Sequence, residues 1–188
     1  MKGMSGSVKL LLALMGCSFI FGIQPVRAVD VNIKITGEIY IPPCKINGDT
    51  AAGILVDFDK ISLYEVDGRN HAKTTAVTVS CDYYQGTPYI RLEGGELRTG
   101  DNILKTAGAN DTALGIALYQ GSDVNTAYPL KVGPGEQGKY GYKITRGLTG
   151  QNSKSGMFTF TAVPVKYGSE ALTAGTFSAT TTMSISYL

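Results

Sequence analysis

The sequence predicts an all-β protein, and three observations support this fold class. Short strand-like segments recur along the chain, and clusters of Gly, Asn, Asp, Ser and Pro separate them. No stretch repeats apolar residues at i, i+3 and i+4 beyond a turn or so, which is the spacing that an amphipathic helix requires. The 24 glycines suit turns and disfavour long helices. We therefore expect one β-sandwich domain with little helix.

Residues 1–28 are predicted to be a secretory signal peptide. Lys2 and Lys9 form a positively charged start, an apolar run follows, and a small-residue pattern favours cleavage after Ala28. A lipoprotein signal around Cys17 is an alternative, although the apolar run continues past that cysteine. The run is too short for a comfortable membrane span, so we expect an exported protein without membrane insertion.

Removal of the signal peptide changes the charge of the chain. The segment holds three of the 17 basic residues and none of the 15 acidic ones, so 14 basic residues remain against 15 acidic residues. The remaining chain of about 160 residues is long enough for one domain with its own core. Its net charge of about −1 leaves no basic face for nucleic acid or for an anionic membrane.

Two cysteines, Cys44 and Cys81, remain once the signal peptide is removed. An even number of cysteines in an exported domain favours a disulfide. A metal site and a catalytic thiol are the alternatives, but both lack companions because His71 is the only histidine. We therefore predict a Cys44–Cys81 disulfide. By restricting the unfolded chain, it would stabilise the folded domain by roughly 4 kcal/mol.

Residues 30–41 alternate between apolar and polar side chains. One set is Val31, Ile33, Ile35, Gly37, Ile39 and Ile41, and the other is Asp30, Asn32, Lys34, Thr36, Glu38 and Tyr40. This alternation is typical of a strand with one buried face. Pro42 and Pro43 end the ladder because neither has an N–H to donate. Gly37 interrupts the apolar row, as expected at a bulge or where another backbone comes close.

The body that follows is predicted to contain short strands. They are Ile54–Phe58, Thr74–Cys81, Pro88–Glu93, Leu114–Gln120, Tyr128–Val132, Gly138–Ile144 and Met157–Tyr167. Turn-forming clusters such as residues 67–70 and 133–135 separate them. We find no internal repeat, linker or second domain in this part of the sequence.

Residues 175–188 form a final alternating strand in this prediction. One face holds Gly175, Phe177, Ala179, Thr181, Met183, Ile185 and Tyr187, and the other holds Ser178, Thr180, Thr182, Ser184, Ser186 and Leu188. The first face is expected to be buried and the hydroxyl-bearing face exposed. Because nothing follows this strand to become its next neighbour, we expect one side of it to be an open edge that invites another strand.

Catalytic machinery is not recognisable in this sequence. His71 lies in a polar turn-like stretch, and Ser122 lacks the strand–elbow–helix context of a nucleophile. Asp57 and Asp59 flank Phe58 with a spacing that favours solvent exposure over paired acid–base chemistry. No set of His, Cys and carboxylate residues has metal-ligand spacing. We therefore expect neither an enzyme nor a bound cofactor or metal.

Together these features resemble the pilin subunits of chaperone–usher fimbriae across the whole mature chain. They are the alternating N-terminal segment, the cysteine pair, the all-β body and the final strand. That strand carries a glycine fourteenth from the end, Gly175, and a tyrosine next to last, Tyr187. Within this family, residues 39–44, 114–121 and 158–164 resemble the minor tip adaptors of P pili.

The resemblance implies an incomplete immunoglobulin-like β-sandwich that lacks its last strand. It implies that residues 29–43 are an N-terminal donor strand and that residues 44–188 are the pilin domain. A periplasmic chaperone, and then the extension of the next subunit, would fill the gap beside the final strand by strand addition. Gly37 matches the extension glycine of the family.

The implied partners are that chaperone, an outer-membrane usher, neighbouring pilin subunits and a tip adhesin. The implied location is the fimbrial tip, reached through the periplasm. An adhesin that binds host glycan is an alternative, but adhesins of this family carry a separate receptor domain before the pilin domain, and the expected extension follows the signal directly. A terminator or a major subunit of the fibre are further alternatives, and the sequence does not decide the position in the fibre.

Overall fold

The structure, a computed structural model, describes residues 31–47, 53–95, 97, 102–135 and 138–188. The predicted signal peptide lies outside the described residues. The chain divides into two compact units, residues 1–38 and 39–188, and the β-sandwich belongs to the second. Within the described part, no helix has the length and apolar character needed to cross a membrane.

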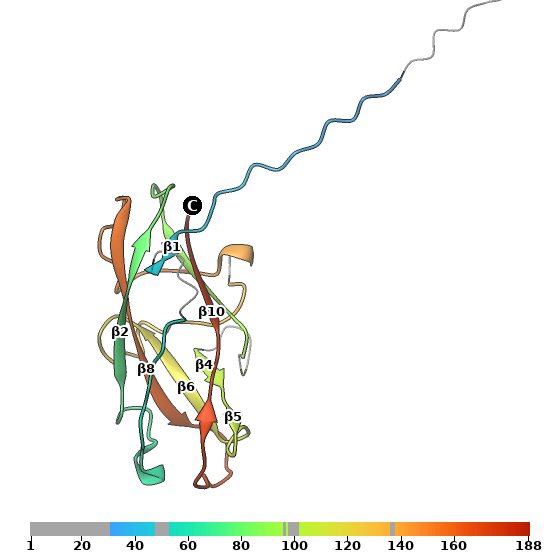
Figure 1. Ribbon diagram of the computed structural model, residues 1–188. Coiled ribbons are helices and arrows are strands. Elements are labelled where there is room, and N and C mark those ends of the chain that lie inside the picture. The colour runs from blue at the N-terminus through green and yellow to red at the C-terminus, as the bar shows by residue number, and fades with distance from the viewer. Residues whose placement is uncertain (1–30, 48–52, 96, 98–101, 136–137) are drawn as a thin grey trace, which may run out of the picture. The chain divides into compact units, whose positions relative to one another are not determined.

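The larger sheet has five antiparallel strands in the order β1-β2-β8-β6-β4 (Figure 1). These are β1 (Lys45–Ile46), β2 (Lys73–Ser80), β8 (Ser155–Lys166), β6 (Leu114–Gln120) and β4 (Ile103–Lys105). The long strand β8 is central: β2 pairs with one side of it and β6 with the other. Its inner residues are buried because both of its neighbours are full-length strands.

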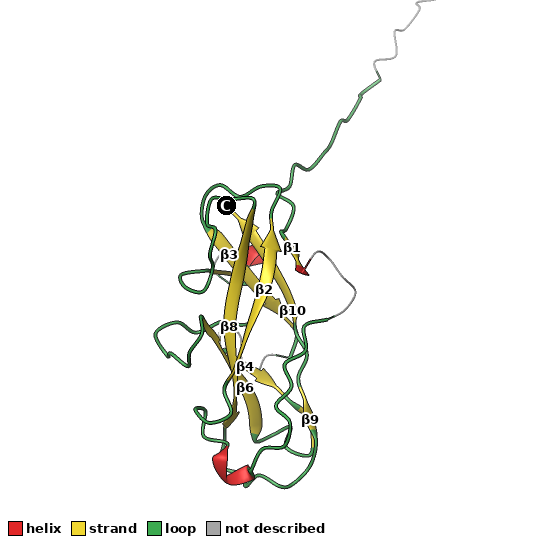
Figure 2. Cartoon of the chain, turned by 60° about the vertical axis from the view of Figure 1, so that its left-hand side comes forward, coloured by secondary structure: helices red, strands yellow, loops and turns green. Residues whose placement is uncertain are grey.

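The second sheet has three antiparallel strands in the order β10-β3-β7, and a two-stranded ladder joins β5 to β9 (Figure 2). The bounds are β10 (Thr182–Tyr187), β3 (Pro88–Glu93), β7 (Tyr142–Lys143), β5 (Ala107–Gly108) and β9 (Phe177–Ser178). Single turns of 3-10 helix form at η2 (Leu63–Glu65) and η3 (Gly138–Tyr140). The strand β10 therefore lies at one end of its sheet.

The core contains the inward residues of both sheets. Its most buried side chains include Val77, Ile90, Leu92, Leu130, Val132, Ile144, Phe158, Val163, Ile185 and Tyr187. On β2, β3 and β10 these residues recur every second position, as the alternation of the sequence predicted. Removal of their apolar surface from water is the main favourable term in the folding of this sandwich.

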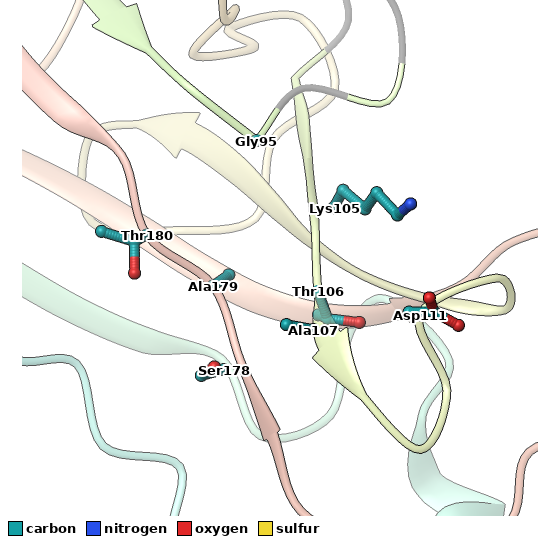
Figure 3. A pocket seen from close by; sticks show the side chains of 8 residues that line it. All are labelled: Gly95, Lys105, Thr106, Ala107, Asp111, Ser178, Ala179 and Thr180. Carbon is teal, nitrogen blue, oxygen red and sulfur yellow. The ribbon is translucent and has the colours of Figure 1, made fainter.

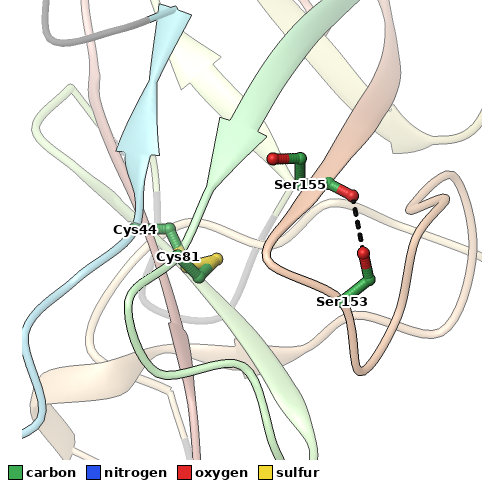
Figure 4. The surroundings of a disulfide bond; sticks show 4 residues. All are labelled: Cys44, Cys81, Ser153 and Ser155. Carbon is green, nitrogen blue, oxygen red and sulfur yellow. Dashed lines mark hydrogen bonds between the residues drawn. A yellow bond between two sulfur atoms is a disulfide. The ribbon is translucent and has the colours of Figure 1, made fainter.

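The predicted disulfide between Cys44 and Cys81 is confirmed (Figure 4). Cys44 directly precedes β1, Cys81 directly follows β2, and their Cα atoms are 4.3 Å apart. The Cys81 N–H donates to the carbonyl of Lys154 at 2.8 Å, so the turn before β8 packs beside the disulfide. In that turn the Ser153 hydroxyl donates to the Ser155 carbonyl at 3.1 Å. The disulfide thus fixes the point at which the N-terminal segment enters the sandwich.

Several predicted strands are confirmed within one or two residues. The predictions Thr74–Cys81, Pro88–Glu93, Leu114–Gln120 and Met157–Tyr167 correspond to β2, β3, β6 and β8. The strands β1, β4 and β5 were not predicted, because segments of two or three residues are too short to show a period of two.

Three predicted strands are wrong. Residues 54–58 are extended, but no backbone hydrogen bond joins them to another described segment, so they do not form a strand. Residues 128–132 contact β6 through isolated bonds, and Pro129 in their middle has no N–H for a ladder. The prediction Gly138–Ile144 becomes η3 followed by the two-residue β7. Gly141 separates these two elements with a left-handed φ of 85°.

Candidate strand-docking site

The C-terminal strand β10 has a neighbour on one side only. It pairs with β3 from Thr182 opposite Glu93 to Tyr187 opposite Pro88. Leu188 exchanges both backbone bonds with Thr87 on that side, at 2.7 and 2.9 Å. In an antiparallel ladder, the N–H and C=O groups of successive residues point alternately to opposite sides. The backbone groups of Met183, Ile185 and Tyr187 therefore point away from β3.

This outer edge of β10 is largely unpaired. Among the described residues, one backbone bond crosses it: the Cys44 N–H donates to the Ile185 carbonyl at 2.7 Å. Met183 and Tyr187 direct their backbone groups to the same side without such a partner in the described chain. An unpaired row of donors and acceptors is a template for another strand.

The segment at residues 53–58 runs beside the C-terminal segment, where β9 leads into β10, and forms the other flank there (Figure 1). Val56 and Phe58 are half-buried and pack against the core, whereas Leu55 and Asp57 are exposed. The ring of Phe58 lies 6.2 Å from the ring of Phe177, between centroids. The C-terminal segment, which has ladder partners on one side, and residues 53–58, which have none in the described chain, thus lie on either side of half-buried apolar side chains.

The residues predicted to form the acceptor edge are Gly175, Phe177, Ala179, Thr181, Met183, Ile185 and Tyr187. From Phe177 to Met183, half-buried residues of this set alternate with exposed residues. Ile185 and Tyr187 are 0% and 2% exposed, while Phe177, Ala179 and Met183 are only partly buried against the core. The cover of the core is therefore complete at the end of β10 and incomplete at its beginning. The role of these residues as an acceptor stays a prediction.

The single strand predicted over residues 175–188 is wrong in one respect, because the chain breaks between β9 and β10. Its neighbour β3 ends at Glu93, where Gly94 and Gly95 turn away with φ values of 100° and 61°. The Thr181 hydroxyl still donates to the Glu93 carbonyl at 3.0 Å. On the N-terminal side of the break, β9 pairs with β5. The C-terminal segment therefore changes its partner from one sheet to another.

Two hollows lie beside this break. One of about 350 Å³ is lined by Gly95, Lys105, Thr106, Ala107, Asp111, Ser178, Ala179 and Thr180 (Figure 3). Figure 3 shows Lys105 and Asp111 on the β4–β5 side, across from the C-terminal segment. The other, of about 150 Å³, has a lining that includes Ile61, Leu63, Asn110, Thr173 and Phe177. This second hollow adjoins the half-buried end of the acceptor face.

Gly175 is required by a close approach rather than by its backbone conformation. A Cβ atom at this position would lie 2.6 Å from the Cβ atom of Ala109, closer than real side chains approach. The φ angle of Gly175 is not left-handed. The glycine therefore lets the chain pass the loop after β5.

Tyr187 is anchored inside the sandwich. Burial raises the pKa of its hydroxyl, and a hydrogen bond to the backbone of Asn152 opposes this shift. Ser186, expected on the exposed hydroxyl face, is only 7% exposed, which corrects that expectation. The turn η3 packs against β10.

The predicted donor residues have no place in the described core. Val31, Ile33, Ile35 and Ile39 are 79%, 82%, 91% and 103% exposed, and residues 31–41 form neither strand nor helix. A Cβ atom at Gly37 would meet nothing within 4 Å. A row of exposed aliphatic side chains is typical of a surface that another molecule covers. The donor role of Val31, Ile33, Ile35, Gly37, Ile39 and Ile41 stays a prediction.

The other polar candidates form local contacts. The His71 ring nitrogen Nε2 lies 2.9 Å from Glu65 Oε2, and both side chains are partly exposed. The described residues contain no group of three His, Cys, Asp or Glu side chains placed to hold a metal ion. The flank that contains Val56 and Phe58 was not predicted as part of the site. The alternation of apolar residues at Ile54, Val56 and Phe58 was the sequence pattern that could have indicated it.

Comparison with known proteins identifies the family. A sequence-family model described as fimbrial protein matches residues 33–188. The chain belongs to the fimbrial protein family. It is 41% identical over 159 residues to the minor fimbrial protein PrsF and to the fimbrial adapter PapF, both from Escherichia coli. In each case the match covers 84% of this chain and 88% of the relative.

Solved structures support the fold. The P pilus adaptor subunit PapF matches with 33% identity and a TM-score of 0.50, over 80% of this chain and all of that one. The P pilus rod subunit PapA matches with 18% identity and a TM-score of 0.52, over 84% of this chain and all of that one, which concerns the fold alone. The predicted fimbrial family and immunoglobulin-like fold are confirmed, and membership places this fimbrial protein in the fimbria.

Proposed function

We propose that this fimbrial protein is a structural subunit that joins its neighbours by donor-strand exchange, and that it serves as a tip adaptor. Residues 29–43 would be the donor strand, and the domain at residues 44–188 would accept a strand between β10 and residues 53–58. The observation that carries this proposal is that one chain has both an open strand edge and an exposed, alternating extension. The extension of one subunit could provide the strand that the open edge of another subunit lacks.

The energetics favour such a joint. Burial of five branched side chains, Val31, Ile33, Ile35, Ile39 and Ile41, would contribute roughly 7–15 kcal/mol as an upper bound at ~1.5–3 kcal/mol each. Ladder hydrogen bonds along the open edge would add a smaller net term. Ordering of the extension reduces the total, because a flexible segment loses conformational freedom when it docks. A non-covalent joint of this kind can be long-lived.

The adaptor role rests on the relatives. The 41% identity to the fimbrial adapter PapF and the 33% identity to the P pilus adaptor subunit in its solved structure support a position between an adhesin and the fibre. The partners would then be a periplasmic chaperone, the outer-membrane usher, an adhesin and a further subunit. The role is structural rather than catalytic, since the site consists of backbone groups and apolar side chains.

The first test compares the domain with and without a bound strand. We expect residues 44–188 alone to aggregate, because the core beside Phe177 and Met183 is incompletely covered. A copy of residues 30–41, fused after Leu188 through a flexible linker, should give a monomer with a cooperative unfolding transition. The matched control is the same fusion with Ile33→Asp and Ile35→Asp in the added copy, which should not rescue the domain. A stable monomer without any added strand would contradict the proposal.

The second test addresses the position in the fibre. The full chain would be expressed with the chaperone and usher and purified from detergent-solubilised cell envelopes, and its copurifying subunits would be identified by mass spectrometry. An adaptor should be found with one adhesin and one fibre subunit. Recovery with a single neighbour would instead indicate a terminator, and a large excess over other subunits would indicate a rod subunit.

A further inference from the structure

The two flanks of the open edge differ in charge. On the C-terminal segment near the Phe58–Phe177 contact, the exposed side chains are Ser178, Thr180 and Thr182, none of which is ionisable. On the opposite flank, the alternation of burial places Val56 toward the core and Asp57 on the outer face. A strand between these flanks would present every second side chain to the same outer face. Of the two flanks, residues 53–58 therefore place a charged side chain on that face, while Lys105 and Asp111 lie beyond the C-terminal segment, across the hollow that it borders.

The Asp57 carboxylate has a defined position on this flank. Its Oδ1 atom accepts the N–H of Asp59 at 2.9 Å, which fixes the side chain beside the edge. Among the described residues, no cation lies within ion-pair distance of Asp57. Its second oxygen and its charge are therefore available to an inserted strand.

The other charges near the edge are partly neutralised within the domain. Asp59 lies 3.4 Å from Lys73 Nζ, in an exposed ion pair. On β3, the neighbour of β10, Arg91 forms an ion pair with Glu93. Lys60 follows Asp59, whose left-handed φ of 55° interrupts the alternation of the flank. Asp57 is thus the charged residue in the extended part of this flank, and its carboxylate has no ion-pair partner in the described chain.

We propose that Asp57 selects the incoming strand by charge. The accepted strand would belong to another fimbrial subunit and would carry a lysine or arginine on its outer face, opposite Asp57, with branched aliphatic residues facing the core. A strand with an acidic residue at this position would be rejected. This inference rests on the proposed function, because it names the chemistry of the strand that the open edge accepts.

Neighbouring side chains on the same face of a sheet interact directly. Opposite charges across two strands favour pairing, and like charges oppose it. Selection between partners then combines the attraction of the correct charge with the repulsion of the wrong one. For one exposed pair we expect a difference of about two- to five-fold between a basic and an acidic strand. The difference should shrink at high salt, because exposed charges are screened.

The test uses the mature chain in complex with its copurifying chaperone, and synthetic peptides based on residues 30–41. The base peptide is made neutral on its polar face with Asp30→Asn, Lys34→Gln and Glu38→Gln. A lysine or a glutamate is then placed in turn at positions 32, 34, 36 and 38. Displacement of the chaperone is followed on native gels. At the position that meets Asp57, the lysine peptide should react about two- to five-fold faster than the glutamate peptide.

Charge reversal makes the test specific. Asp57→Lys should invert the preference at that position, and Asp57→Asn should abolish it. The matched control Asp82→Asn, at an exposed position after Cys81, should leave it unchanged. Equal rates for lysine and glutamate peptides at all four positions, or a preference that Asp57→Lys leaves unchanged, would overturn the inference. If no peptide enters the domain at all, it is the proposed strand docking that fails.

Discussion

The N-terminal extension and the C-terminal strand have the same alternation of apolar and polar residues but different surroundings. In residues 31–39 the aliphatic side chains are exposed, whereas Ile185 and Tyr187 on β10 are buried. The difference arises because β10 pairs with β3 and lies over the core, while residues 31–41 form no strand in the described chain. An alternating pattern thus specifies a strand that needs a sheet, and the neighbour that completes the sheet can belong to another molecule.

The largest expected effect separates these two regions with the same substitution. Ile185→Asp should prevent folding, because an unpaired carboxylate at a position with 0% exposure costs about 4 kcal/mol or more. Ile35→Asp, at a position that is 91% exposed, should leave the chaperone-bound fold unchanged but prevent docking into a neighbouring subunit. Periplasmic yield and a two-subunit exchange reaction measure the two outcomes. If Ile35→Asp also abolished folding, residues 30–41 would belong to their own sandwich.

Removal of the disulfide tests the junction between the two regions. Among the described residues, Cys44 donates the one backbone bond that reaches the outer edge of β10, and the disulfide closes a loop between positions 37 apart. The double change Cys44→Ala and Cys81→Ala should lower the free energy of unfolding by about 4 kcal/mol. Urea unfolding of the strand-complemented fusion measures it. Mass spectrometry of unreduced peptides provides the control, since free thiols on both cysteines of the parent protein would refute the disulfide itself.

Substitutions at two glycines should have smaller effects: one should lower the stability of the domain, and the other should prevent docking without changing stability. Gly175→Ala should destabilise the domain by about 1–3 kcal/mol, because the added Cβ atom would lie 2.6 Å from that of Ala109. Gly37→Leu should leave folding and chaperone binding intact, since nothing lies within 4 Å of a Cβ atom at this position. It should nevertheless block entry of the extension into the neighbouring subunit, where the donor backbone is expected to lie close to the receiving surface. Normal exchange by the Gly37→Leu variant on a gel would show that this glycine is only a bend.

The smallest expected effect concerns the turn before β2, far in sequence from both regions. The N–H groups of Asn70 and then of Arg69 hold the pKa of Asp67 below its ordinary value of 3.8. These bonds favour the charged carboxylate in the folded state. Their contribution to stability is therefore present above pH 3.8 and is lost as the pH falls through the lowered pKa of the folded protein.

Asp67→Asn should remove this part of the acid sensitivity. Urea unfolding of the strand-complemented fusion at pH 5 and at about pH 3 measures the change. Asp82→Asn is the matched control at another exposed position. An unchanged difference between the two pH values in the Asp67→Asn variant would show that the turn does not contribute.

The local pattern of the sequence determined much of this molecule. The alternation of residues 175–188 predicted the core positions Ile185 and Tyr187, whereas the shared face of residues 30–41 stays a prediction. Two cysteines left after the predicted export predicted the disulfide. Turn-forming clusters predicted the bounds of β2, β3, β6 and β8, because side-chain period and turn preference depend on neighbours in the sequence.

The tertiary structure alone decided which segments meet. The break between β9 and β10 lies where the neighbouring strand β3 ends at Glu93, and Ser186 is buried although its hydroxyl-bearing face was expected to be exposed. The flank at residues 53–58 has a strand-like pattern but no ladder partner in the part of the chain that the structure describes, and only its position beside the C-terminal segment made Asp57 a candidate for strand selection. Strand pairing joins residues far apart in the chain, so a period of two specifies a face but not the neighbour that covers it.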